Sequence, residues 1–171
     1  VVDFTEFDTT YWFTSRLRHV QYLYGVDTVK CDAGELSWYN ENTRFASEVT
    51  RHYPNLITTQ YVKACSDFGK MVEVRAGFRS QKYPVFVRMY DKYSTWTFEN
   101  GLKSLITTAL TMSIAGYSYI LPDMIGGNGL PNDELYIRWV QANTFLPSMQ
   151  FSIPPWAFEN KNVINITQKY I

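Results

Sequence analysis

Four charged residues in this chain of 171 residues share one feature: each stands just past the end of a segment predicted to be a β-strand. They are Asp32, Arg79, Asp91 and Asp123. The carboxyl ends of parallel strands meet at one rim, where α/β folds build their active sites. Because the chain has only two histidines, a catalytic metal site built from histidines is nearly excluded. Carboxylates on one rim therefore indicate acid/base or nucleophilic chemistry, of which glycoside hydrolysis is the main example.

The composition excludes several other classes of protein. Lys and Arg total 16 and Asp and Glu total 16, so the chain lacks the net positive charge of a general nucleic-acid binder. Hydrophobic residues make up 46% of the chain, which is too many for a disordered segment. No apolar run reaches the roughly 18 residues that a membrane span needs. We therefore expect a folded domain with no nucleic-acid partner and no membrane segment of its own.

Hydrophobic periodicity predicts strands that alternate with helices. The predicted strands are 26–31, 71–76, 85–90, 117–121 and 148–153, and the predicted helices are about 10–24, 54–68, 98–114 and a fourth that Asn132 caps. In the third helix, Leu102, Ile106 and Leu110 form the predicted buried stripe. The alternation indicates a parallel α/β sheet that is covered on both faces. The tail 154–171 is predicted to be irregular.

One connection does not fit a regular parallel sheet. Only five residues separate Arg79 from Val85, whereas a crossover between parallel strands usually takes a dozen or more. Either one of the two strands is wrongly assigned or the sheet is irregular there.

Two further features concern covalent chemistry. Cys31 and Cys65 are predicted to be buried free thiols, because two isolated cysteines do not make a disulfide framework. The tripeptide Asn165-Ile166-Thr167 is the only N-glycosylation sequence in the chain. Such tripeptides are common by chance, so this one is a weak indication of the secretory-pathway lumen.

Three sequence motifs follow one another along the chain: Lys-Cys-Asp-Ala-Gly-Glu at 30–35, Leu-Pro-Asp-Met-Ile-Gly-Gly-Asn at 121–128, and Glu-Leu-Tyr-Ile-Arg-Trp-Val-Gln followed by Phe-Leu-Pro between 134 and 147. In order and spacing they resemble the motifs of glycoside hydrolase family 31. The first resembles the family's nucleophile motif, and the others resemble its Asp-hydrophobic-Gly-Gly and Glu-Leu…Arg-Trp-x-Gln…Phe-x-Pro segments. Segments 79–81, 84–88 and 91–92 are closest to the myogenesis-regulating glycosidase branch of the family.

The resemblance implies a (β/α)8 TIM-type barrel. A full barrel takes about 250 residues, so this chain is expected to supply only about strands 4–8. It would be a single partial catalytic domain over 1–171, the second part of a barrel whose N-terminal half is missing here. The implied protein is a retaining α-glycosidase that acts on a terminal α-linked sugar and uses no cofactor or metal.

The resemblance also implies roles for individual residues. Asp32 matches the family's nucleophile, and Asp91 matches its general acid/base. Arg79 matches an arginine that contacts substrate, and Asp123 matches an acid that binds sugar hydroxyls. Three aromatic residues in loops after strand ends are candidate platforms for sugar rings: Trp38, Tyr39 and Trp96. Glu35 either orients the nucleophile loop or is simply exposed.

Two departures from the family pattern bear on the sugar. Arg88 stands where α-glucosidases of the family commonly carry a tryptophan, and Ser152 stands where they carry a substrate-contacting histidine. A changed pocket must bind a different arrangement of hydroxyls. Both changes fit the myogenesis-regulating branch, so the expected specificity is α-galactosidase-like, with α-glucosidase specificity as the alternative.

Other interpretations remain open at this stage. The protein could be a catalytically inactive relative that binds carbohydrate, although Asp32 and Asp91 are both present. The Gly-rich loop 125–129 could cradle a phosphate, although it lacks the Lys-Ser/Thr of a P-loop. The family resemblance favours the lumen of the secretory pathway, with any membrane anchor upstream, and the start of the chain is typical of the inside of a longer protein.

Overall fold

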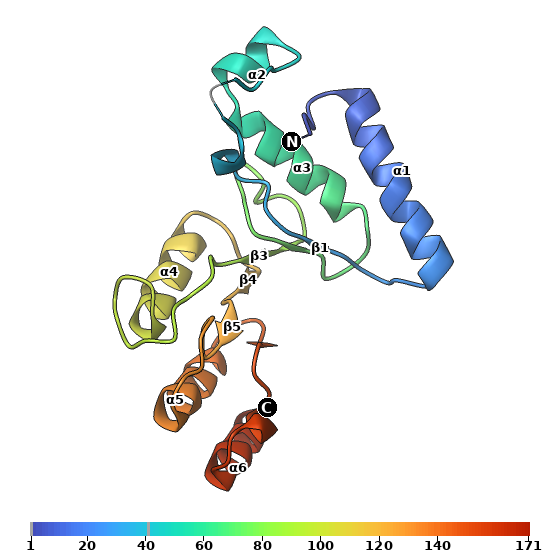
Figure 1. The fold of residues 1–171 in the computed structure, drawn as a ribbon. Coiled ribbons are helices and arrows are strands. Elements are labelled where there is room, and N and C mark those ends of the chain that lie inside the picture. Colours follow the sequence, from blue (N-terminus) through green and yellow to red (C-terminus); the bar gives the residue numbers. More distant parts are fainter. Residues whose placement is uncertain (1, 41) are drawn as a thin grey trace. The chain divides into compact units, whose positions relative to one another are not determined.

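The computed structural model describes residues 2–40 and 42–171 (Figure 1). Contacts among these residues divide the chain into two compact units, one that ends at Val87 and one that starts at Arg88. Each unit has its own helices and parallel strands. Within the described ranges, no helix is long and apolar enough to cross a membrane.

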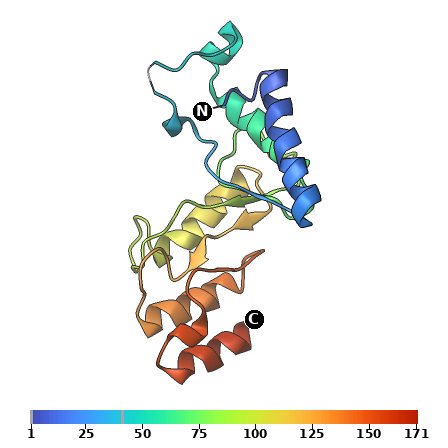
Figure 2. The same ribbon diagram turned by 45° about the vertical axis from the view of Figure 1, so that its right-hand side comes forward.

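The first unit contains a short parallel sheet with helices packed against it. Its elements are α1 (Phe7–Tyr24), β1 (Lys30–Cys31), the 3-10 helix η1 (Leu36–Trp38), α2 (Glu48–His52), α3 (Asn55–Ser66), β2 (Glu73–Val74) and β3 (Phe86–Arg88), whose last residue begins the second unit. Gly25 ends α1 in the left-handed conformation, which agrees with the end of the helix predicted over about 10–24. Helices α1 and α3 lie side by side in both views (Figures 1 and 2).

The register of the sheet places buried residues opposite one another. Strands β1 and β2 are parallel, with Lys30 opposite Glu73 and Cys31 opposite Val74. Strands β2 and β3 are also parallel, with Val74 opposite Val87. Because successive side chains alternate between faces, the buried residues Cys31, Val74 and Val87 form one row on a single face of the sheet.

Strand β2 is shorter than the sequence predicts, and this explains the connection that did not fit. The strand stops at Val74 instead of continuing to residue 76, so residues 75–85 are available to link β2 to β3. Eleven residues are close to the length that a parallel crossover requires. Both strands are real, and the connection between them contains no helix.

The prediction of free thiols at Cys31 and Cys65 is wrong, because the structure joins the two in a disulfide. Cys31 lies on the helix-facing side of β1, and Cys65 lies in α3 with no exposed surface. Their Cα atoms are 6.4 Å apart, within the range that a disulfide spans. The packing of a helix against a strand brings the two sulfurs together, and cysteine counting cannot detect such packing.

The second unit has a core centred on α5. Its elements are α4 (Leu102–Ile114), β4 (Ile120–Leu121), β5 (Met124–Ile125), α5 (Asp133–Asn143), β6 (Gln150–Phe151), the 3-10 helix η2 (Pro155–Ala157) and α6 (Lys161–Tyr170). Strands β5 and β6 are parallel. Asn132 caps α5 as the sequence predicts, because its side chain accepts a hydrogen bond from the backbone N–H of Leu135. Tyr136 and Trp139 of α5 are completely buried in the core.

The predicted buried stripe of α4 is partly wrong. Leu102 is buried, but Ile106 and Leu110 are each 59% exposed, and the helix instead buries Leu105 and Ala109. The helix is apolar on more than one face, so periodicity alone does not identify the face that meets the core.

The tail 154–171 is not irregular as predicted, because it forms η2 and α6. The side chain of Asn160 caps α6 by accepting a hydrogen bond from the N–H of Asn162. Val163 and Thr167, four residues apart, are both buried, and α6 packs beside α5 (Figures 1 and 2). Most residues on the other sides of the helix are polar, so its helical periodicity was present in the sequence.

The disulfide leads to a prediction about stability. It closes a loop with a sequence separation of 34 residues, and a loop of that length is expected to contribute about 4 kcal/mol by restricting the unfolded chain. Replacing Cys31 and Cys65 together by Ala should therefore lower the free energy of unfolding measured in urea by an amount of that order. Reductant should lower the stability of the unsubstituted protein and leave the double variant unchanged. Equal unfolding midpoints for the two proteins without reductant would contradict the assignment.

Candidate active site

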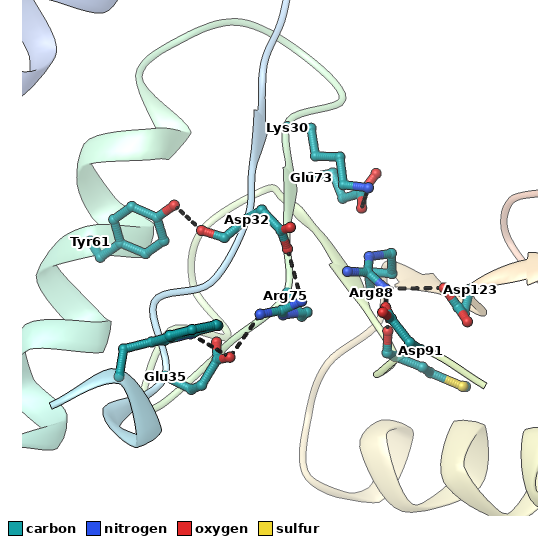
Figure 3. Close-up of polar contacts among 11 residues, drawn as sticks. Lys30, Asp32, Glu35, Tyr61, Glu73, Arg75, Arg88, Asp91 and Asp123 are labelled. Carbon is teal, nitrogen blue, oxygen red and sulfur yellow. Dashed lines mark hydrogen bonds and ion pairs between the residues drawn. The ribbon is translucent and has the colours of Figure 1, made fainter. Parts of the chain in front are cut away.

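The first cluster of charged side chains lies at the carboxyl ends of β1 and β2. One guanidinium nitrogen of Arg75 (Nη1) lies 3.3 Å from Oδ1 of Asp32, and the other (Nη2) donates to Oε1 of Glu35 at 2.8 Å (Figure 3). The side chains of Arg75 and Glu35 are mostly buried, whereas that of Asp32 is 55% exposed. Arg75 therefore holds two carboxylates, and the one predicted to be the nucleophile remains open to solvent.

The turn after β1 positions Asp32 and Glu35. Ala33 and Gly34 both have positive φ angles, of 59° and 93°. A side chain at Gly34 would collide with the ring of Tyr61, so glycine meets both the backbone and the space requirement there. Glu35 also accepts a hydrogen bond from Nε1 of Trp38 at 2.8 Å. This contact, with the ion pair to Arg75, places Glu35 within the cluster and resolves the alternative that the sequence leaves open.

Helix α3 holds the same turn through two hydrogen bonds to its backbone. The hydroxyl of Tyr61 donates to the backbone carbonyl of Asp32 at 2.6 Å, and the hydroxyl of Thr58 donates to the carbonyl of Gly34 at 2.7 Å. The pKa of Tyr61 is raised to about 12, mainly by burial and also by the negative charges of Asp32 and Glu35, while Arg75 opposes the rise. The hydroxyl therefore stays protonated, as a donor, throughout the neutral range.

A cavity of about 290 Å³ lies beside this turn. Asp32, Gly34, Trp38, Tyr39 and Tyr61 are among the residues that line it. Trp38 is 58% exposed and shares this cavity with Asp32, while Tyr39 donates to the backbone carbonyl of Val2. Two of the predicted aromatic platforms therefore lie close to the predicted nucleophile.

The second cluster lies in the second unit and is centred on Arg88. Nη1 of Arg88 donates to Oδ1 of Asp91 at 2.8 Å, to Oδ1 of Asp123 at 3.0 Å and to the backbone carbonyl of Met89 at 3.0 Å (Figure 3). Asp123 is fully buried and Arg88 is nearly so, but the side chain of Asp91 is 48% exposed. The arrangement again joins a buried arginine to one exposed carboxylate, here the predicted acid/base.

Asp123 stabilises the loop that carries Asp91. Its backbone lies in the left-handed region, with φ of 67°, and its Oδ2 accepts a hydrogen bond from the backbone N–H of Lys92 at 2.8 Å. Burial raises the pKa of Asp123, while backbone hydrogen bonds from Lys92 and Met124 and the charge of Arg88 oppose the rise. Asp123 thus contacts both the backbone beside Asp91 and the arginine that binds Asp91.

Lys92, which was not among the predicted site residues, fixes this loop from inside the second unit. Its ammonium group is buried and donates to Oγ of Ser104 at 2.8 Å, and burial lowers the pKa of Lys92. The Gly-rich loop packs against the same segment: the N–H of Asn128 donates to the carbonyl of Lys92, and the N–H of Gly129 donates to Oγ of Ser94. These amides are thus bound to the loop that carries Asp91, which argues against a phosphate cradle.

Three further predicted residues lie on the surface. Arg79 is exposed, with φ of 50°, and its guanidinium lies 5.3 Å from the ring centre of Phe78. Trp96 is 38% exposed in the loop after Asp91, and Ser152 is exposed just after β6. Their roles in binding substrate stay predictions. Among the described residues, no group of three or more His, Cys, Asp or Glu side chains could hold a metal ion.

Arg75 was not among the predicted site residues, because the predicted strand ran to residue 76. With β2 ending at Val74, Arg75 is the first residue past the strand. A usable signal was the polar pair Glu73 and Arg75, two residues apart on one face of an otherwise apolar run.

Comparison with known proteins identifies the class to which this fold and these clusters belong. The model of the glycosyl hydrolases family 31 TIM-barrel domain matches residues 1–171. The chain is 38% identical over 182 residues to the myogenesis-regulating glycosidase of Mus musculus, a match that covers 99% of this chain and 25% of that protein. It is 35% identical over 168 residues to the SITS-binding protein of Tetronarce californica, covering 94% of this chain and 23% of that protein. The chain therefore belongs to glycosyl hydrolases family 31, and it spans about a quarter of the length of these relatives.

A solved structure supports the same fold. The match to the cycloalternan-degrading enzyme from Trueperella pyogenes covers 98% of this chain and 27% of the chain of that enzyme. The TM-score is 0.79 and the sequence identity is 24%. The parallel strands and helices described above are thus part of a (β/α)8 barrel, as the sequence predicts.

The tyrosine beneath the turn leads to a pH prediction. An unfolded tyrosine releases its proton near pH 10, but folded Tyr61 holds it to about 12, so its contribution to stability is complete below pH 10 and is lost as the pH rises to 12. The pKa values of Tyr39 and Tyr136 are also raised to about 12, so these residues lower the stability as the pH rises through the same range. Replacing Tyr61 by Phe should remove its pH-dependent contribution to the free energy of unfolding, on the order of 2–3 kcal/mol. The free energy measured in urea should then fall less steeply between about pH 10 and pH 12. Tyr22→Phe, at an exposed tyrosine, is the control. Parallel plots of the free energy of unfolding against pH for Tyr61→Phe and the unsubstituted protein would contradict the prediction.

Proposed function

We propose that the protein is a retaining α-glycoside hydrolase in which Asp32 is the nucleophile and Asp91 is the general acid/base. The observation that carries the proposal is the position of Asp32: it follows β1 directly, is open to solvent, and is held through Oδ1 by a mostly buried arginine. A carboxylate that must attack a sugar needs both access and a fixed orientation. Membership of a glycosidase family makes hydrolysis of a glycosidic bond the reaction that such a carboxylate would serve.

The reaction would proceed in two displacements. The carboxylate of Asp32 attacks the anomeric carbon, and Asp91 gives its proton to the leaving glycosidic oxygen as the bond from that oxygen to the carbon breaks. Asp91 then takes a proton from water, whose oxygen attacks the anomeric carbon and releases Asp32. Two inversions at one carbon retain its configuration. The mechanism requires the two carboxyl groups to lie about 5–5.5 Å apart across one sugar ring.

Arg75 is the positioning residue for this chemistry. Its two terminal nitrogens bind separate carboxylates, and Glu35 is itself fixed by Trp38. The bidentate geometry of a guanidinium allows this double contact, whereas the single ammonium of lysine does not reproduce it. Asp32 would therefore keep one orientation while its side chain stays exposed to solvent.

For the sugar, we favour an α-galactoside. The support is Arg88, a buried charged donor between Asp91 and Asp123 at a position where family α-glucosidases commonly carry an aromatic ring. Fixed polar groups in a pocket select strongly among hydroxyl arrangements. Two relatives suggest other substrates: the 1,3-alpha-isomaltosidase from Kribbella flavida is 32% identical, and the alpha-xylosidase from Emericella nidulans is 31% identical. We would therefore compare α-glucosides and α-xylosides with α-galactosides as substrates.

We also propose that the protein works in the lumen of the secretory pathway. The disulfide between Cys31 and Cys65 supports this location, because disulfides persist in oxidising compartments and are rare in the cytosol. The substrate there would be a carbohydrate with a terminal α-linked sugar.

Substitution of the two carboxylates tests the function. In the complete protein, Asp32→Asn should abolish hydrolysis of aryl α-galactosides whatever the leaving group, because no covalent intermediate can form. Asp91→Asn should cost roughly 10²–10⁴-fold with a poor leaving group and much less with a good one, because a good leaving group needs no proton. NMR should show the α-anomer as the first product. Asp67→Asn, at an exposed carboxylate, is the control. Full activity of Asp32→Asn would exclude the nucleophile assignment, and sugar binding by an inactive unsubstituted protein would favour the carbohydrate-binding alternative.

The roles of Arg75 and Arg79 can be distinguished in the same assay. Arg75→Met and Arg75→Lys should each lower kcat roughly 100-fold, because the orientation of Asp32 is lost. Arg79→Met should mainly raise KM if Arg79 contacts substrate. A larger fall in kcat for Arg79→Met than for Arg75→Met would show that the positioning role has been assigned to the wrong arginine.

A further inference from the structure

Helix α6 carries the tripeptide Asn165-Ile166-Thr167, the only N-glycosylation sequence of the chain. Residues two apart on an α-helix point about 200° from each other around its axis. The structure follows this geometry, because Asn165 is exposed while Thr167 has no exposed surface. The asparagine therefore projects to solvent from the side of α6 that faces away from its buried stripe.

The surface around Asn165 has room for a large polar group. The residues three and four positions before and after it on the helix are all exposed and polar: Lys161, Asn162, Gln168 and Lys169. Neighbours at these spacings are the ones that meet on a helix surface. An attached oligosaccharide would thus lie over hydrated side chains and would displace no packing contact of α6.

An independent observation in the first unit points to the compartment in which such modification takes place. The disulfide between Cys31 and Cys65 requires an oxidising environment, such as the lumen of the endoplasmic reticulum. We propose that Asn165 carries an N-linked glycan. The proposal does not depend on the catalytic assignments, because Asn165 belongs to neither charged cluster.

The burial of Thr167 sets the order of events. Its hydroxyl is buried, and no hydrogen-bond partner for it is found among the described residues. A transferase that must contact both ends of the tripeptide can reach this hydroxyl only before α6 folds. The transfer joins Nδ2 of Asn165 to the anomeric carbon of a lipid-pyrophosphate-linked oligosaccharide. The bond from that carbon to the pyrophosphate breaks, the lipid pyrophosphate leaves, and the nitrogen loses one proton to the transferase.

Peptide mapping of the complete protein, expressed through the secretory pathway of a eukaryotic cell, tests the proposal. Treatment with an amidase that removes N-glycans should increase the mobility of the protein on a denaturing gel and convert Asn165 of the peptide 162–169 to aspartate. Recovery of that peptide with unmodified Asn165 and no glycan would overturn the proposal.

Three variants sharpen the test. Asn165→Gln and Thr167→Val should each abolish the modification of this peptide, and Thr167→Ser should retain it. Thr167→Val is the matched control for folding, because valine has nearly the shape of threonine and removes a buried hydroxyl without a partner. Its thermal stability after enzymatic deglycosylation of both proteins should equal or exceed that of the unsubstituted protein. A glycan that persists on this peptide in Thr167→Val would also overturn the assignment.

Discussion

The parallel register of β1 and β2 is the constraint on which the first cluster depends. Because Cys31 lies opposite Val74, the next residue of each strand, Asp32 and Arg75, emerges at the same edge of the sheet. A shift of the register by one residue would turn every side chain of a strand to the other face. The disulfide would then be lost together with the ion pair, so the packing of the core and the position of the carboxylate are fixed by the same pairing.

Helix α3 supports this arrangement at successive points along the chain. The disulfide holds Cys31, the hydroxyl of Tyr61 holds the carbonyl of Asp32, and Thr58 holds the carbonyl of Gly34. Each hydrogen bond contributes only about 1 kcal/mol, but together they leave the turn little freedom. In the second unit, Asp123 and Lys92 restrain the loop of Asp91 in a comparable way, through a buried carboxylate and a buried ammonium. Both exposed carboxylates are therefore carried by backbone that buried groups hold in place.

The sequence was informative where a feature is local and less so where it depends on packing. Gly25 as a helix stop, Asn132 as a cap and the motif around Asp32 could be recognised because each acts within a few residues. The end of β2 could not, because it is set by pairing with β1, and Arg75 was therefore not recognised as the first residue past the strand. The disulfide depends on surfaces that meet only in the folded chain, whereas the amphipathic pattern of α6 was present in the sequence. Periodicity also chose the wrong stripe of α4, since Leu105 and Ile106 are equally apolar and only the first meets the core.

Covalent trapping tests the central claim, that Asp32 attacks the sugar, most directly. The complete protein would be incubated with a 5-fluoro-α-glycosyl fluoride, digested, and its peptides mapped by mass spectrometry. A stoichiometric adduct on the carboxyl group of Asp32, absent from Asp32→Asn, is the predicted result. An adduct on any other carboxylate, or turnover of the reagent with inverted product and no adduct at all, would contradict the account.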